Sequence, residues 1–240
     1  MKQDDPGSRD IPASEAQDSC KNCGTCCLKG GPAFHKEDKE LLESGRISMA
    51  DVYTIREGEP IYDNVKDVTL FADTDIIKIK GVQRTWSCRF LDQATNNCQI
   101  YKDRPIECQA LKCWDTRDIE SIYQANRLTR KDLVSGVEGL WELIEDHHEK
   151  CSYHLLRSFL KDRGKAPDEK STERILEMIK YDLAIRPMMV EKGLLDPEIL
   201  DFLLGRPLIE TISMFGLEVV KEGDGYCLEL KKTTSKDRNS

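Results

Sequence analysis

The chain has 240 residues, which is enough for one large domain or two small ones. Its 36 lysines and arginines are outnumbered by 44 aspartates and glutamates, and the net charge of −8 predicts no nucleic-acid partner. No apolar run approaches the roughly 20 residues that span a bilayer, and residues 1–19 lack the apolar region of a secretory signal. We therefore expect a cytoplasmic protein without a membrane partner.

Ten cysteines are the most informative feature of the composition. A secreted disulfide scaffold is usually much shorter and carries a signal peptide, whereas clustered thiols in a reducing compartment more often bind metals or take part in redox chemistry. Eight of the ten lie between Cys20 and Cys113. The composition therefore predicts a metal-binding first half.

The first half reads as irregular sequence with short helices and strands. Residues 1–19, rich in Asp, Ser, Pro and Gln, predict a disordered lead, and a cysteine- and glycine-rich loop follows. Two short helices are predicted next, over 35–45, where Gly45 ends the first, and over 49–55.

Strand character then appears over 76–80 and 86–91. Asn96 and Asn97 suit a turn, so Cys88 and Cys98 flank a predicted hairpin.

The second half is charged and favours helices. Apolar residues at helical spacing predict one long helix over 130–163, which Gly164 and Pro167 end. Further helices are predicted over 169–186, before Pro187, and over 197–204 and 207–215, with a hairpin formed by the apolar segments on either side of residues 222–225.

These elements predict an α+β fold: an irregular, cysteine-rich, metal-binding N-terminal half with short helices and a small hairpin, followed by a mainly α-helical C-terminal half. The predicted division is a disordered lead over 1–19, a cysteine-cluster metal-binding domain over 20–115, and a mainly helical domain over 116–240 that ends in a hairpin.

The strongest local motif is the run Cys20-Lys-Asn-Cys23-Gly-Thr-Cys26-Cys27. Two residues between successive cysteines let their thiolates surround one inorganic centre, as in the C-x₂-C-x₂-C runs that bind iron–sulfur clusters. Gly24 lets the backbone turn tightly between ligands. Cys27 directly follows Cys26, and adjacent side chains diverge, so Cys27 is predicted to serve a second site or to be buried.

The fourth ligand must come from elsewhere, and Cys88, Cys98, Cys108 and Cys113 are the candidates. Pro105 suits the first position of a helix, which places Cys108 near the positive end of that helix and favours its thiolate. Cys113 can join the same centre only if the helix ends between it and Cys108. We predict a primary set of Cys20, Cys23, Cys26 and Cys108, in which Cys88 and Cys98 replace a member or form a second site.

Over residues 20–113 the chain resembles the CxxCxxCC proteins, described as a putative zinc- or iron-chelating domain and also called the YkgJ-type cysteine cluster family. The four cysteines of the first run match the family's first block. Its later block is matched by Cys88, Cys98, Ile100, Tyr101, Arg104, Pro105 and Cys108. Where the family often has an aromatic residue after the last cysteine, this chain has Gln109-Ala110-Leu111 and then Cys113.

Flagellin lysine N-methylase is similar over the cysteine region, and this likeness implies an iron–sulfur cluster rather than plain zinc. The favoured hypothesis is therefore a 4Fe-4S cluster used for redox or cofactor-dependent chemistry on a substrate or protein partner. The alternatives are a non-catalytic zinc module for partner binding and a metal carrier, because four cysteines are also an ordinary zinc ligand set. No glycine-rich loop of the Rossmann type follows a strand.

A second group of possible ligands, His147, Cys151 and His154, would share one face of the predicted helix over 130–163. The same face continues an apolar stripe that includes Ile144 and Phe159. We predict that this group packs in the interior and does not bind metal.

Overall fold

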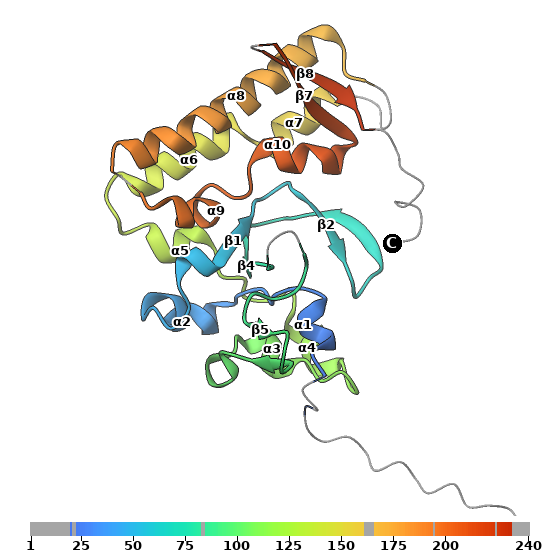
Figure 1. Ribbon diagram of the computed structural model, residues 1–240, viewed down its shortest axis with the longest axis vertical. Coiled ribbons are helices and arrows are strands. Elements are labelled where there is room, and N and C mark those ends of the chain that lie inside the picture. The colour runs from blue at the N-terminus through green and yellow to red at the C-terminus, as the bar shows by residue number, and fades with distance from the viewer. Residues whose placement is uncertain are drawn as a thin grey trace, which may run out of the picture.

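The computed structural model describes residues 20, 23–82, 85–160, 166–193, 195–223 and 225–231. The predicted disordered lead, residues 1–19, lies outside them. The described residues contain helices and small antiparallel sheets, with β1 to β6 before α3 to α10 and a final hairpin of β7 and β8, which confirms the α+β class. In Figure 1 the segments that carry the clustered cysteines lie at one end of the molecule and the C-terminal helices at the other. Within the described ranges, no helix is both long and apolar enough to cross a membrane.

The first half consists of short elements. They are α1 (Thr25–Leu28), α2 (Lys39–Glu43), β1 (Val52–Ile55), β2 (Pro60–Asp63), β3 (Val68–Phe71), β4 (Ile76–Ile79), β5 (Leu91–Asp92), β6 (Asn97–Cys98), α3 (Ile106–Ala110) and α4 (Arg117–Ile122). The helix predicted to end at Gly45 is present as α2, and Gly45 takes the left-handed conformation, with φ of 72°, that glycine adopts without strain.

The strands of the first half form three of the four two-stranded antiparallel sheets in the described residues: β1 with β4, β2 with β3, and β5 with β6. The strand predicted over 76–80 is confirmed as β4. The helix predicted over 49–55 is wrong beyond a single 3₁₀ turn at Met49–Asp51. Residues 52–55 are β-branched or aromatic, and they pair with β4 in the register Val52↔Ile79.

The strand predicted over 86–91 is also mostly wrong, because within it only Leu91, at the start of β5, and Cys88, in an isolated bridge to Gly81, are paired. The predicted turn is present: Asn96 has a φ of 55°, and the β5–β6 hairpin places Cys98 opposite Leu91.

The second half is mainly helical. Its elements are α5 (Arg130–Val134), α6 (Leu140–Lys150), α7 (Tyr153–Phe159), α8 (Glu169–Glu191), α9 (Leu200–Leu203), α10 (Leu208–Thr211), β7 (Leu217–Glu222) and β8 (Gly225–Leu230). The predicted terminal hairpin is confirmed, since β7 and β8 pair over their whole length.

The single helix predicted over 130–163 is wrong, because two interruptions divide it into α5, α6 and α7. Gly139 has a φ of 74° before α6, and Ser152 caps α7 by accepting a hydrogen bond from the backbone N–H of Leu155. In contrast, α8 continues through Pro187, where a break was predicted. Pro187 lies on an exposed face, while Ile185 and Met189 hold the opposite face in the core.

The described residues form two main apolar cores and a small third cluster around Ile55 and Ile76. The larger one joins β1, β4 and the residues before α2 to α6, α8 and α9, through side chains such as Phe34, Ile77, Ile144 and Phe202. The smaller one lies among α7, α8, α10 and β7. The larger core contains residues from both sides of the predicted boundary at 115/116, and the division into domains stays a prediction.

A buried ion pair crosses the same boundary. Arg130 donates to the two carboxylate oxygens of Asp75 over 2.7 and 3.0 Å, and to the carbonyl oxygen of Leu203 over 2.7 Å. The Arg130 side chain is only 2% exposed. These bonds tie the turn before β4 to the start of α5 and the end of α9.

Candidate metal centre

The first cysteine run forms a tight turn into a one-turn helix. Gly24 has a φ of 72° and precedes α1, which carries Cys26 and Cys27. A Cβ atom at Gly24 would lie 3.1 Å from Oδ1 of Asn96, at the tip of the β5–β6 hairpin. A glycine is therefore needed here both for its backbone conformation and for the close approach of the two cysteine-bearing segments.

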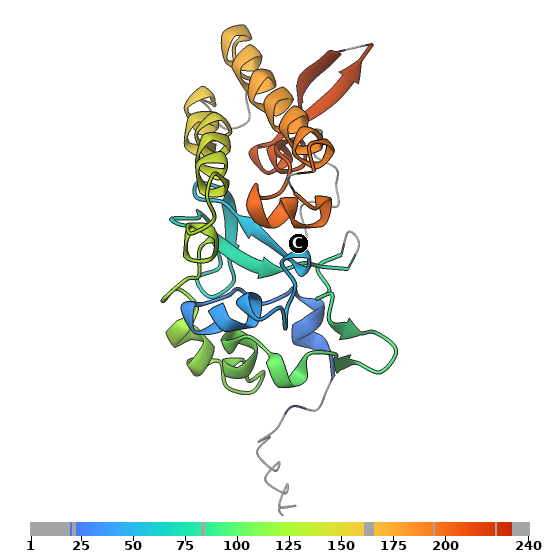
Figure 2. The same ribbon diagram turned by 90° about the vertical axis from the view of Figure 1, so that its left-hand side faces the viewer.

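Three further segments bring cysteines to α1. The backbone N–H of Cys88 donates to the carbonyl oxygen of Cys27 over 2.8 Å. Cys98 ends β6, and Cys108 is the third residue of α3, which begins at Ile106 directly after Pro105. Figures 1 and 2 both place α1, the β5–β6 hairpin and α3 side by side at the same end of the molecule.

The thiols of these segments lie close enough to influence one another. Burial raises the pKa of Cys108, and the neighbouring Cys88, Cys98 and Cys26 raise it further because like charges repel. Burial together with Cys98 and Cys26 raises the pKa of Cys88 in the same way, and Cys88 is only 8% exposed. The structure therefore brings together Cys26, Cys27, Cys88, Cys98 and Cys108, none of which forms a disulfide.

Cys26 and Cys27 form a hydrogen-bonded pair with their sulfur atoms 4.0 Å apart. This hydrogen bond lowers the pKa of Cys26 to about 6, and it raises the pKa of Cys27. A thiolate at Cys26 is the form that binds metals.

Two cationic side chains flank the thiols. Arg104 lies near Cys26 and lowers its pKa by electrostatic attraction, and the Arg104 guanidinium stacks 3.7 Å from the centre of the Tyr101 ring. Lys78 of β4 interacts with Cys108 and Glu107, although burial lowers the pKa of Lys78. Positive charge on both sides offsets the charge of clustered thiolates, so the donor set fits a metal ion or a cluster.

The remaining predicted ligands lie further out. Cys20, Cys23 and Cys113 are exposed, although Cys23 interacts with Cys26. Thr25 is 3.3 Å from the sulfur of Cys23, and this hydrogen bond lowers the pKa of Cys23. The α3 helix ends at Ala110, before Cys113, as a shared centre would require. The assignment of individual ligands stays a prediction.

The sulfur atoms are not arranged around a single point. Among the described residues, no three of these sulfurs lie within 4.8 Å of one another. A single zinc ion with Zn–S bonds of about 2.3 Å would hold its ligands about 3.8 Å apart in a tetrahedron. In the described residues, the thiols are therefore not placed as the ligands of one tetrahedral zinc ion.

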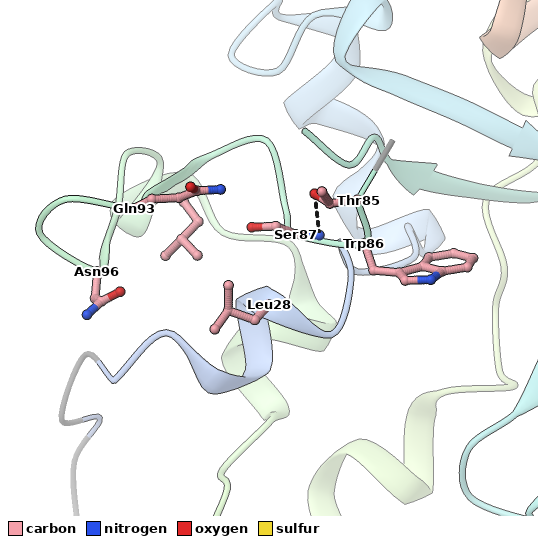
Figure 3. Close-up of a pocket in the computed structure, with 7 residues that line it drawn as sticks. Leu28, Thr85, Trp86, Ser87, Gln93 and Asn96 are labelled. Carbon is pink, nitrogen blue, oxygen red and sulfur yellow. Dashed lines mark hydrogen bonds between the residues drawn. The ribbon is translucent and has the colours of Figure 1, made fainter. Parts of the chain in front are cut away.

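A hollow of about 530 Å³ opens beside the cysteine segments. Figure 3 shows Leu28 and Ser87 facing it from α1 and from the segment before Cys88, with Gln93 and Asn96 on the hairpin. The Ser87 hydroxyl is buried and has no hydrogen-bond partner, whereas Trp86 at the rim is 71% exposed. The hollow gives solvent or a partner access to the vicinity of the thiols.

The second group of possible ligands is divided by the break between α6 and α7. Because α6 ends at Lys150, His154 is not on the same helix as His147, and the predicted shared face is wrong. His147, Cys151 and Asp182 do lie together in the interior, with donor atoms within 4.8 Å of one another.

These three groups already have partners or cationic neighbours. His147 Nε2 is 2.8 Å from Oδ1 of Asp182, and the same carboxylate accepts from Arg186 and from the backbone N–H of Leu208. Burial lowers the pKa of His147 to about 4, and the nearby Arg56 and Arg186 also disfavour a further positive charge. Such surroundings disfavour a metal cation.

We therefore expect Cys151→Ala to leave the metal content per chain unchanged and to lower the free energy of unfolding by about 1 kcal/mol, as a typical core substitution does. Metal analysis and urea unfolding of the same preparation measure the two effects. A folded Cys151→Ala protein that has lost its metal would place α6 in the metal site.

Two residues beside the centre, Lys78 and Glu107, were not predicted from the sequence. Lys78 interrupts an apolar strand, and Glu107 directly precedes Cys108. The position of Glu107 next to a predicted ligand was the one feature of the sequence that could have indicated its role. Its hydrogen-bond partners, however, are 20 to 74 residues away in sequence.

Comparison with known proteins agrees with this geometry. Residues 19–129, slightly less than half of the chain, match the family model CxxCxxCC, described as a putative zinc- or iron-chelating domain. No curated protein and no solved structure matches the chain.

Proposed function

Because residues 19–129 carry a zinc- or iron-chelating domain of the CxxCxxCC family, we propose that the clustered cysteines bind an iron–sulfur cluster. The observation that carries this proposal is the convergence of thiols from four segments, around α1, Cys88, β6 and α3, on one partly buried region. Among the described residues, no three of these sulfurs lie as close together as one zinc ion would hold them, which is compatible with the larger iron–sulfur cluster.

We propose that Cys26, Cys88, Cys98 and Cys108 are the ligands. Cys26 and Cys108 belong both to the set predicted from sequence and to the group gathered in the fold. Cys88 and Cys98 then take the places predicted for the exposed Cys20 and Cys23.

The surrounding residues would affect the bound group in two ways, by offsetting its negative charge and by limiting its contact with water. Arg104 and Lys78 offset the negative charge of thiolate ligands, and the burial of Cys88 together with the partial burial of Cys108 limits water at that side. When bound, an iron–sulfur cluster supplies electron transfer or a reactive iron site. The hollow beside Ser87 is where a reaction partner would approach.

A structural zinc site or a metal carrier is the second candidate. One distance favours it: the sulfur atoms of Cys26 and Cys27 are 4.0 Å apart, close to the separation that one tetrahedral zinc ion needs. Adjacent residues nevertheless rarely ligate the same ion comfortably, so we place this candidate second.

Anaerobic purification followed by analysis of iron, acid-labile sulfide and zinc distinguishes the two candidates. We expect about four irons and about four sulfides per chain, the composition of a 4Fe-4S cluster. One or two zinc ions per chain without sulfide would contradict the iron–sulfur proposal and support the zinc candidate.

A further inference from the structure

A buried polar network lies directly behind Cys108. Its centre is Glu107 of α3, whose side chain is 14% exposed. The carboxylate has three donors from three segments: Oε2 accepts from the backbone N–H of Ala33 over 2.7 Å, and Oε1 accepts from Arg127 over 2.8 Å and lies 3.1 Å from His35 Nε2. No other residue of α3 is held by so many groups in the described contacts.

The protonation of His35 follows from its neighbours. Its Nδ1 is 2.6 Å from the carbonyl oxygen of Ala125, which can only accept, and its Nε2 faces the carboxylate of Glu107. Nδ1 therefore carries a proton, and Nε2 donates to the carboxylate when it is protonated as well. Burial alone would lower the pKa of His35, but the hydrogen bonds to Glu107 and Ala125 raise it above its usual value.

A second bond fixes the start of the same helix. The Oδ1 atom of Asp38, which is buried, accepts the backbone N–H of Ile106 over 2.8 Å, and its Oδ2 accepts the backbone N–H of His35 over 3.0 Å. Strand β4 is joined to the network through the bridge between Ala33 and Lys78. The five-residue α3 is thus clamped at Ile106 and at Glu107.

Glu107 and Cys108 point to different sides of α3. Successive residues on a helix point about 100° apart, so fixing the Glu107 side chain also fixes the direction of the Cys108 side chain. A helix as short as α3 has little stability of its own and depends on such tertiary contacts.

We propose that Glu107 is a positioning residue for the metal centre: its carboxylate holds α3 against the segments at Ala33, His35 and Arg127, so that Cys108 faces the other cysteines. This inference rests on the proposed metal-binding function. Partners of this kind, behind a ligand, commonly change metal affinity by about 10–100-fold when they are replaced.

The test compares Glu107→Gln with Glu59→Gln in protein purified with its metal. Glu59 is the matched control, because its carboxylate also lies in the interior, accepts the backbone N–H of Arg56 and pairs with Arg206, but it makes no described contact with a segment of the metal centre. The readout is the rate at which a strong chelator removes the metal, with circular dichroism to confirm folding.

We expect Glu107→Gln to release metal about 10–100 times faster than the unsubstituted protein, because an amide cannot replace a carboxylate that has three donors. Glu59→Gln should release metal at the unsubstituted rate. Equal rates for Glu107→Gln and the unsubstituted protein, or equal acceleration in both variants, would overturn the positioning role.

If Glu107→Gln does not fold, Arg127→Met takes its place, because it removes one donor and leaves the contact between Glu107 and His35. A smaller acceleration in the same direction is then expected, and an unchanged rate overturns the inference. Failure of the proposed function is distinct, since the unsubstituted protein would then hold no metal, or zinc without sulfide, before any residue is replaced.

Discussion

Replacing Cys108 with serine is expected to abolish metal retention. Cys108 is a predicted ligand with three thiol neighbours, since Cys26, Cys88 and Cys98 all act on it. A serine hydroxyl has nearly the same size but does not supply the thiolate that zinc and iron–sulfur clusters require. Metal per chain, measured after anaerobic purification and desalting, should fall from the unsubstituted value to background.

Cys227→Ser is the control for this prediction. Cys227 lies in the terminal hairpin, at the opposite end of the molecule from α1 and α3, and its replacement should leave the metal content unchanged (Figure 1). Full occupancy in a folded Cys108→Ser protein would rule out Cys108 as a ligand. Comparison of Cys98→Ser with Cys23→Ser then separates the proposed ligand set, which predicts the larger loss at Cys98, from the set predicted by sequence, which predicts it at Cys23.

The largest effect on stability is expected from Asp75→Ala. This change leaves the Arg130 guanidinium, which is 2% exposed, without its carboxylate partner in the interior. Breaking a buried ion pair by removing one partner typically costs about 3–5 kcal/mol. Urea unfolding followed by circular dichroism should show the free energy of unfolding reduced by about this amount.

Asp115→Ala is the matched comparison, because Asp115 also pairs with an arginine through two hydrogen bonds, of 2.8 and 2.6 Å, but on the surface. The Arg117 side chain is 85% exposed, so solvent screens this pair and can replace it. Similar losses of unfolding free energy in both variants would show that the buried pair of Asp75 and Arg130 stabilises the protein no more than the exposed pair does.

Local sequence patterns were sufficient to predict the elements whose formation depends mainly on neighbouring residues. The terminal hairpin, β4 and the end of α2 at Gly45 were predicted, because turn residues and strand residues mark them directly. The helix predicted over 49–55 failed because Val52 to Ile55 find a partner strand 21 to 27 residues away, and no local pattern reveals that pairing.

The division of residues 130–163 into three helices was also not predictable from a local pattern. The apolar spacing was correct for Leu133, Leu140 and Ile144, which contribute to one core, but spacing does not show where a chain reverses. Gly139 and Ser152 mark the breaks, and each is compatible with a continuous helix when it is considered alone.

The cysteines of the metal centre were predictable from the sequence, but the residues that surround them were not. Spacing identified all five converging cysteines as candidates, and the fold ranks them by gathering Cys88 and Cys98 beside Cys26 while Cys20 stays exposed. Glu107 and Lys78 were not predictable, because their roles arise from contacts with His35, Ala33 and Arg127 that exist only after folding.

The most direct test of the central claim, that these cysteines hold an inorganic centre, is X-ray absorption at the metal edge of the anaerobically purified protein. The account predicts a first shell of sulfur atoms at about 2.3 Å, the distance typical of metal–thiolate bonds. An additional iron shell would identify a cluster. A first shell made only of nitrogen and oxygen atoms would contradict the account.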